Sequence, residues 1–319
     1  MTARDCAFPP RRTIPLVRKH RRALTVVAGL LLAEFLSPAQ ALSSVPDDVF
    51  QMSIDAALTR AVSTMLPESS NVDGAFLNPA YDPNILLGAD AQVSVTFVSE
   101  GAGYRNTLGY VLFTDGAFDG LTKSDVDTNG NHRISLAELD AVAGTELGLL
   151  FPNASAQGSG GDLAPGDTVF LNDGNLLSAG TSIGFFLIQN AWTGHNILGW
   201  DVADVGAQVF YSIDHLNPEA AAAATIGDPG ANSRHVAMMH VGETILLGFE
   251  DLVRPGGDND FNDAVFFVSA TPGIALAPTD VFRVFEPQSA VLLLIGFAAA
   301  LHLSPRRRRV APARAGGGQ

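Results

Sequence analysis

The chain has a single cysteine and very few basic residues away from its two ends. Cys6 is the one cysteine among 319 residues. The chain after residue 41 therefore has neither a disulfide nor a thiol nucleophile, which excludes cysteine-dependent catalysis and Cys-ligated zinc sites. Between Ala41 and Ser304, seven Lys and Arg stand against 31 Asp and Glu, a formal charge of about −24, compared with −14 for the whole chain. Because this charge repels phosphate groups, we expect binding neither to nucleic acid nor to anionic lipid headgroups.

Short sequence motifs of common catalytic sites are also missing. The chain has no G-x-S-x-G nucleophile elbow and no Gly-rich phosphate loop ending in Lys-Ser/Thr. Its histidines after the first 40 residues lack the spacing of a zinc site, so most are expected to be surface or core residues. Apolar residues make up 47% of the chain, which is enough for a folded core.

The two ends of the chain have the composition of export and sorting segments. Residues 1–22 are basic, residues 23–36 are mostly apolar, and Ala39-Gln40-Ala41 follows as an A-x-A cleavage pattern. This order predicts a secretory signal peptide over residues 1–41, with a retained membrane helix as the alternative.

At the other end, Phe285-Glu286-Pro287 precedes the apolar run 290–303 and then four arginines, Arg306 to Arg309. An apolar run closed by arginines is a stop-transfer pattern with its positive side in the cytoplasm. The arrangement resembles the PEP-CTERM sorting tail of exosortase substrates in Gram-negative bacteria, with Phe285 in place of the first proline. The resemblance implies processing by an exosortase-like enzyme and transient association of a C-terminal hydrophobic helix with the inner membrane. The alternatives are a plain C-terminal anchor and an ordinary core helix.

The region between these ends has the pattern of a mostly β protein. Residues 46–66 have apolar side chains at helical spacing, with Asp47 placed to cap an amphipathic helix. Strands are predicted at residues 92–98, 109–114, 168–171, 183–189, 208–212, 236–241, 244–249 and 264–269. Short strands separated by polar turns, with little helix between them, predict an all-β fold, an antiparallel β-sandwich or jelly roll.

One twelve-residue segment has the spacing of an EF-hand calcium loop. Counted from Asp127 as position one, an aliphatic residue falls at position eight and a glutamate at position twelve. His132 occupies position six, where the sharp turn favours glycine, so we expect a reduced affinity. The alternative is an Asp/Asn turn without metal. The candidate metal-binding residues of this loop are Asp127, Asn129, Asn131, Arg133, Ser135 and Glu138.

A second acidic segment lies further along the chain, at residues 249–263. Asp258, Asp260 and Asn262 alternate, so an extended segment would point all three side chains to one side. Carboxylates this close repel one another unless a cation or a proton compensates, which favours a second Ca²⁺ site. The alternatives are a Gly/Asp turn held by its own hydrogen bonds and by Arg254, and acid catalysis. The candidate ligands are Glu250, Asp251, Asp258, Asp260, Asn262 and Asp263.

Three stretches together resemble the domain-of-unknown-function 4114 family over roughly residues 90–270. They are residues 95–110, residues 184–190, and residues 248–263 with the closing Asp-Phe-Asn-Asp motif. The resemblance implies a secreted bacterial domain that is β-rich and binds calcium through Asp258, Asp260, Asn262 and Asp263; it implies no reaction.

These observations predict the following organisation of the chain: signal peptide 1–41, N-terminal helix and linker 42–88, calcium-binding β-sandwich 89–272 with an EF-hand-like insertion 118–142, linker 273–284, and sorting tail 285–319. The predicted function is that of an exported, non-enzymatic calcium-binding protein of the cell surface or biofilm matrix, with Ca²⁺ as a structural cofactor. One alternative is a Ca²⁺-dependent carbohydrate-binding module for extracellular polysaccharide, in which Trp192, Trp200 or Tyr104 would stack on sugar near a metal loop. A hydrolase with paired carboxylates is a further alternative.

Overall fold

The computed structural model describes residues 42–200 and 207–284. The predicted signal peptide and the predicted sorting tail with its hydrophobic helix lie outside these residues. Within the described ranges, no helix has both the length and the apolar character needed to cross a bilayer.

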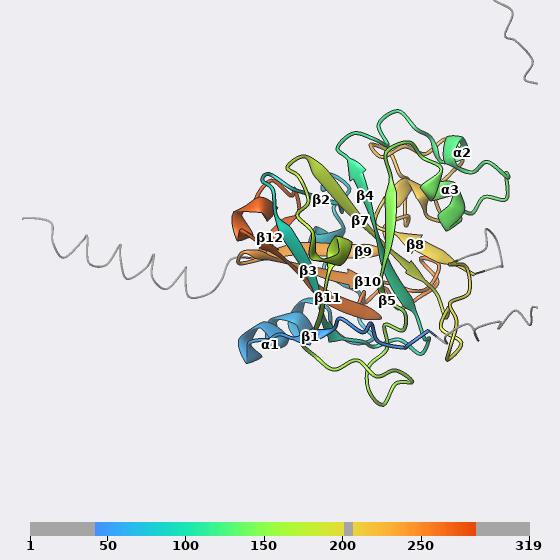
Figure 1. The fold of residues 1–319 in the computed structure, drawn as a ribbon. Helices are drawn as coiled ribbons and strands as arrows, with labels where there is room; N and C mark the ends of the chain where they lie inside the picture. The colour runs from blue at the N-terminus through green and yellow to red at the C-terminus, as the bar shows by residue number, and fades with distance from the viewer. Residues whose placement is uncertain (1–41, 201–206, 285–319) are drawn as a thin grey trace, which may run out of the picture. The chain divides into compact units, whose positions relative to one another are not determined.

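Two β-sheets dominate the described part of the chain (Figure 1). One has seven strands in the order β1-β6-β3-β11-β10-β9-β12, and the other has the order β2-β7-β4-β5 with β8 also paired to β7. All pairings are antiparallel except that of β12 with β9. The strands are β1 Phe50–Gln51, β2 Ile85–Leu86, β3 Gln92–Ser99, β4 Thr107–Thr114, β5 Glu146–Phe151, β6 Asp167–Phe170, β7 Thr181–Ile188, β8 Val209–Tyr211, β9 Val236–Val241, β10 Thr244–Phe249, β11 Ala264–Thr271 and β12 Phe282–Val284. The helices are α1 Ala56–Met65, α2 Lys123–Val126 and α3 Leu136–Asp140, with 3-10 turns η1 Gly74–Leu77, η2 Leu171–Gly174, η3 Asp214–Leu216 and η4 Gly273–Leu276.

The main core lies between the two sheets. Leu108, Tyr110 and Leu112 of β4 belong to this core, whereas Val111 and Phe113 of the same strand belong to a second apolar cluster. Alternate residues of a strand point to opposite faces, so both faces of the sheet are covered by apolar side chains. The antiparallel pairing and the shared core are consistent with a β-sandwich.

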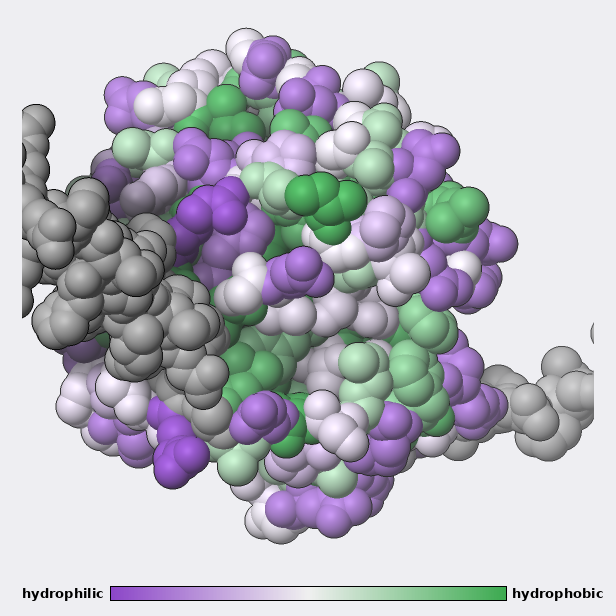
Figure 2. All heavy atoms as spheres, turned by 90° about the vertical axis from the view of Figure 1, so that its left-hand side faces the viewer, coloured by the Kyte–Doolittle hydropathy of each residue, from purple (hydrophilic) through white to green (hydrophobic). Residues whose placement is uncertain are grey.

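Each sheet also has a covered outer face. Residues of the segment from Phe118 to Leu139 pack on the outer face of the sheet that contains β4 and β7. Val62 of helix α1 and Leu66, which directly follows the helix, pack on the outer face of β9, β10 and β11. On the side shown in Figure 2, the visible hydrophobic residues form small separate groups among polar ones.

The eight predicted strands correspond to β3, β4 and β6–β11, which confirms them. The prediction of one helix over residues 46–66 was too long: Phe50–Gln51 forms β1 against β6, and α1 begins only at Ala56, so Asp47 is not its N-cap. The prediction of a linker at residues 273–284 was wrong, because this segment adds η4 and β12 and contributes Ala275, Leu276 and Val281 to the main core. Strands β2 and β5 were missed as well.

Candidate functional site

The second acidic segment forms the loop between β10 and β11, residues 250–263, which we call the acidic loop. The loop folds back on its own hairpin, because the Phe249 carbonyl accepts a hydrogen bond from the Asp263 N–H at 3.2 Å. A glycine is required at position 248, where a Cβ atom would lie 2.3 Å from the carbonyl oxygen of Phe261. The Glu250 N–H donates to the His235 carbonyl at 3.0 Å, so the first and last residues of the loop are both held at the end of the sheet.

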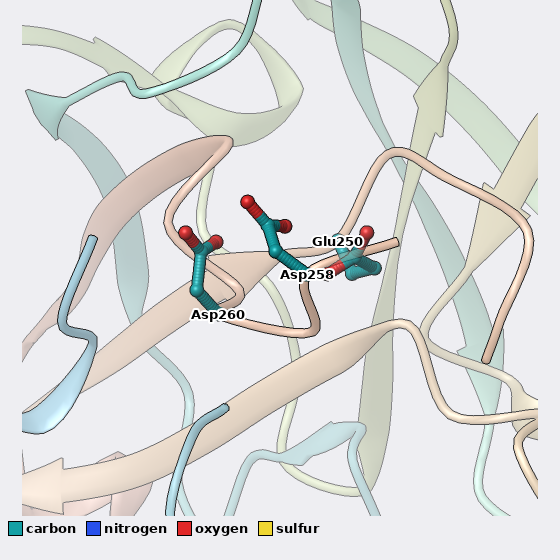
Figure 3. A group of neighbouring side chains, drawn as sticks. All are labelled: Glu250, Asp258 and Asp260. Carbon is teal, nitrogen blue, oxygen red and sulfur yellow. The ribbon is translucent and has the colours of Figure 1, made fainter. Parts of the chain in front are cut away.

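Glu250, Asp258 and Asp260 converge within this loop. Their side chains can each offer one oxygen such that all three oxygens lie within 4.8 Å of one another. Asp258 and Asp260 extend to the same side of the loop, and Glu250 approaches from the end of β10 (Figure 3). Asp258 is exposed and Asp260 is buried. Three converging carboxylate oxygens, one of them open to solvent, are the type of donor that Ca²⁺ prefers.

Glu250 is the unusual member of this group. Its side chain is 0% exposed, and neither carboxylate oxygen has a hydrogen-bond partner. Burial, followed by the charges of Asp258 and Asp260, raises the pKa of Glu250 to about 7, and the backbone of Leu252 has a weaker, opposing effect. A buried carboxylate without hydrogen bonds is costly in its charged form, so Glu250 needs either a proton or a cation.

The other predicted ligands of this loop lie beside the three-carboxylate group. The Asp251 N–H donates to Asp263 Oδ2 at 2.7 Å, and Asn106 Nδ2 donates to Asp251 Oδ2 at 2.6 Å. Burial, followed by the charge of Asp251, raises the pKa of Asp263 to about 8. Burial also raises the pKa of Glu100, whose Oε1 is buried without a hydrogen-bond partner. Carboxyl groups whose charged form is disfavoured by burial therefore extend beyond the three converging carboxylates.

The segment 258–262 is not extended, contrary to the prediction from its alternating residues. Asn259 and Phe261 have φ values of 58° and 56°, in the left-handed region. The side-chain Nδ2 of Asn262 donates to Glu68 Oε2 at 3.0 Å. Glu68, Glu100 and Asn106 were not predicted as site residues. Glu100 directly follows an alternating strand, but nothing local marks the other two.

The hydrogen bonds of a metal-free turn account for only part of the acidic loop. Arg254 Nε donates to Asn259 Oδ1, Asn259 Nδ2 donates to the Gly257 carbonyl, and the Asn262 N–H donates to Asp260 Oδ1. These contacts explain the shape of the loop. They do not explain Glu250, whose oxygens take part in none of them.

The EF-hand-like segment closes into a compact loop. Asp127 accepts the N–H groups of Asn131 and His132 at 3.1 and 2.8 Å, and Asn131 Oδ1 accepts the Arg133 N–H at 2.8 Å. His132 has φ 66°, the left-handed conformation expected at position six. Glu138, at position twelve, accepts hydrogen bonds from Thr128, Asn129 and Ser135. Burial raises the pKa of Glu138, but these hydrogen bonds outweigh that effect and lower the pKa overall.

This loop is anchored on the sheet by its apolar positions. Ile134 is 4% exposed, and its carbonyl accepts a hydrogen bond from Tyr211 Oη at 2.7 Å. The entering helix is only α2, Lys123–Val126, and the exiting helix α3 ends at Asp140. Because Asp127 and Glu138 already accept hydrogen bonds, the geometry of this loop does not by itself require a metal.

Most of the candidate aromatic and histidine side chains are buried or packed on other apolar side chains. Trp192 is 5% exposed within the outer apolar cluster, and Trp200 stacks on Phe186, whereas Tyr104 is 40% exposed. The prediction of a sugar-stacking role for Trp192 is therefore not compatible with its burial. The histidines His215, His235 and His240 are buried, and His195 belongs to a different, exposed segment.

Comparison with known proteins gives one finding. Residues 177–271 match the family model described as a domain of unknown function (DUF4114). The matched residues include strands β7–β11 and the whole acidic loop. No curated protein and no solved structure matches the chain.

Proposed function

We propose that this chain is an exported calcium-binding protein in which the acidic loop is the principal metal site and Ca²⁺ has a structural rather than a catalytic role. The single observation that supports this most strongly is Glu250. It is fully buried, both of its oxygens lack partners, and it faces two further carboxylates. A divalent cation would satisfy both oxygens and offset the repulsion within the group.

The donor set fits calcium better than the other common metals. All candidate ligands at the acidic loop are oxygens, which are hard donors, and the group has no histidine or thiolate. Glu250, Asp258 and Asp260 would hold the ion, and Asp251, Asp263 and Asn262 would support the loop around it. The EF-hand-like loop, with Asp127, Asn129, Asn131, Arg133, Ser135 and Glu138, is proposed as a second and weaker site.

Export and surface location remain proposals from the sequence alone. The signal peptide and the exosortase-type tail support a cell-surface or matrix location in a Gram-negative bacterium. Extracellular calcium modules commonly bind with dissociation constants of about 10⁻⁴ to 10⁻³ M, an affinity that suits such a location. Binding of extracellular polysaccharide is the alternative function, and with Trp192 buried it would have to use Tyr104 or another exposed group.

The test is calorimetric titration of the full chain with Ca²⁺, joined to thermal melts in EDTA and in rising Ca²⁺. Calcium at 100-fold its dissociation constant is expected to add about 2.7 kcal/mol of stability per site. The double variant Asp258→Ala/Asp260→Ala should lose the main part of this gain and Glu138→Ala a smaller part. Asp228→Ala, which removes an exposed carboxylate elsewhere, is the matched control and should retain all of it. If millimolar calcium changes neither the heat signal nor the melting temperature, the proposed function is wrong.

A further inference from the structure

The segment that follows helix α1 makes repeated contacts with the acidic loop. The Ser69 N–H donates to Asp260 Oδ2 at 2.8 Å, and Glu68 Oε2 accepts from Asn262 Nδ2 at 3.0 Å. Three residues further on, the Val72 N–H donates to the Asn259 carbonyl at 2.9 Å. Three hydrogen bonds from residues 68–72 thus end within four consecutive residues of the loop.

The first of these bonds acts on a proposed ligand directly. The Asp260 carboxylate accepts the Ser69 N–H at Oδ2 and the Asn262 N–H at Oδ1, so both of its oxygens are oriented by backbone donors. Each carboxylate oxygen keeps a second lone-pair direction that can face a cation. A ligand held in this way loses less conformational entropy when the metal binds.

The same segment is held at its other end by helix α1. Val62 and Leu66 are 4% and 3% exposed and pack on the outer face of β9, β10 and β11. The position of Ser69 therefore depends on how α1 is docked, and the position of Asp260 depends on Ser69.

From these contacts we propose that calcium binding at the acidic loop and docking of helix α1 are coupled, with Glu68 and Ser69 as the positioning residues that join them. This inference rests on the proposed function, since it assumes that the loop binds calcium. Coupling is reciprocal: if a docked α1 favours binding, then binding favours a docked α1. Without calcium, the apolar surface under α1 would be uncovered more often.

The first test is amide hydrogen exchange of the full chain, carried out in a Glu138→Gln background to remove the EF-hand-like site. Calcium is expected to slow exchange in residues 250–263 and, to a similar degree, in residues 56–72. Slowing in the loop without any change in residues 56–72 would overturn the coupling and leave the calcium site standing. If neither segment responds and calorimetry in the same background finds no binding, both the calcium site and the coupling are wrong.

The second test measures the reverse direction. Val62→Ala removes part of the buried contact between α1 and the sheet and should weaken calcium binding about fivefold or more, the lower end of ordinary coupling energies. Leu177→Ala is the matched control. Leu177 is 5% exposed and pairs with Ala91, which directly precedes β3. The acidic loop contacts Gly101, which follows the opposite end of β3, so Leu177 is a buried residue at the other end of this strand from the loop. This control should change affinity less than twofold, and equal affinity losses in the two variants would refute the coupling.

A third comparison separates positioning by Glu68 from a general effect of its charge. Glu68→Gln keeps an acceptor for Asn262 Nδ2 and should retain the calcium-dependent protection of residues 56–72. Glu68→Ala removes the acceptor and should reduce that protection. Equal behaviour of the two variants would exclude the hydrogen bond as the connection.

Discussion

Replacement of Glu250 by glutamine should stabilise the protein without calcium and destabilise it relative to wild type with calcium. In the metal-free protein at alkaline pH, Glu250 is a charged carboxylate that is fully buried and lacks hydrogen bonds. Glutamine has nearly the same shape but no charge, so Glu250→Gln removes the unfavourable electrostatic energy and keeps the packing.

The pKa of Glu250 gives the size and the pH range of this effect. Burial, with the charges of Asp258 and Asp260, raises the pKa from 4.5 to about 7 in the folded protein. Because the folded state holds this proton more tightly than the unfolded state, the stability associated with Glu250 is complete below about pH 4.5 and is lost as the pH rises through 7. This pKa difference lowers the free energy of unfolding at pH 8 by at most about 3 kcal/mol. For a domain of this size, each kcal/mol is worth about 2–4 °C in Tm.

The assay is thermal and urea unfolding of the full chain at pH 5 and pH 8, in EDTA and in excess Ca²⁺. In EDTA, Glu250→Gln should equal wild type at pH 5 and exceed it by about 1–3 kcal/mol at pH 8. In Ca²⁺ at pH 8 the order should reverse, because only the wild type gains binding energy at the acidic loop. Asp258→Asn is the control. This variant should lose the calcium response of the acidic loop, because Asp258 is one of its three converging carboxylates. Because the Asp258 side chain is exposed, its stability in EDTA should change much less than that of Glu250→Gln. If Glu250→Gln is less stable than wild type in EDTA at pH 8, the argument from its buried charge is refuted.

Three further predictions concern other parts of the structure. His132→Gly should stabilise the EF-hand-like loop by up to about 1 kcal/mol and raise its calcium affinity, because His132 has φ 66°; unchanged stability in urea unfolding would contradict this. Arg234→Ala should lower the free energy of unfolding by about 3–5 kcal/mol in the same assay, because it leaves the buried Asp214 without its ion-pair partner. Arg283 is exposed, so Arg283→Ala should have little effect. Gly257→Ala should weaken calcium binding at the acidic loop on the order of tenfold in calorimetry, since a Cβ there would lie 2.2 Å from Glu250 Oε1 and displace this carboxylate. Wild-type affinity would contradict the prediction.

The strands were predictable because their signal is local. Gln92–Ser99 alternates apolar and polar residues and is bounded by turn residues, and the structure places β3 there. By contrast, β1 and β12 are two and three residues long, and they exist because β6 and β9 offer free edges. A pairing between segments far apart in the chain leaves no mark in a two-residue window.

The candidate site was only partly predictable for a related reason. The acidic residues of the loop are visible in the sequence, and the convergence of Glu250 with Asp258 and Asp260 agrees with the choice of candidates. Their geometry was not predictable, because left-handed residues at Asn259 and Phe261 break the alternation. The contribution of Glu68 arises from a contact across 194 positions, which no spacing rule describes.

The two proposed calcium loops have a common relation to the fold. The EF-hand-like loop packs on the outer face of one sheet through Ile134 and Leu136, and the acidic loop contacts the segment that holds α1 on the outer face of the other. Calcium bound at these loops would therefore order the layers that cover the sandwich rather than build the sandwich itself. It follows that removal of calcium should leave the inner strands β3 and β11 protected from hydrogen exchange while α1 and residues 118–142 exchange faster, and uniform loss of protection would show that the loops also support the inner core.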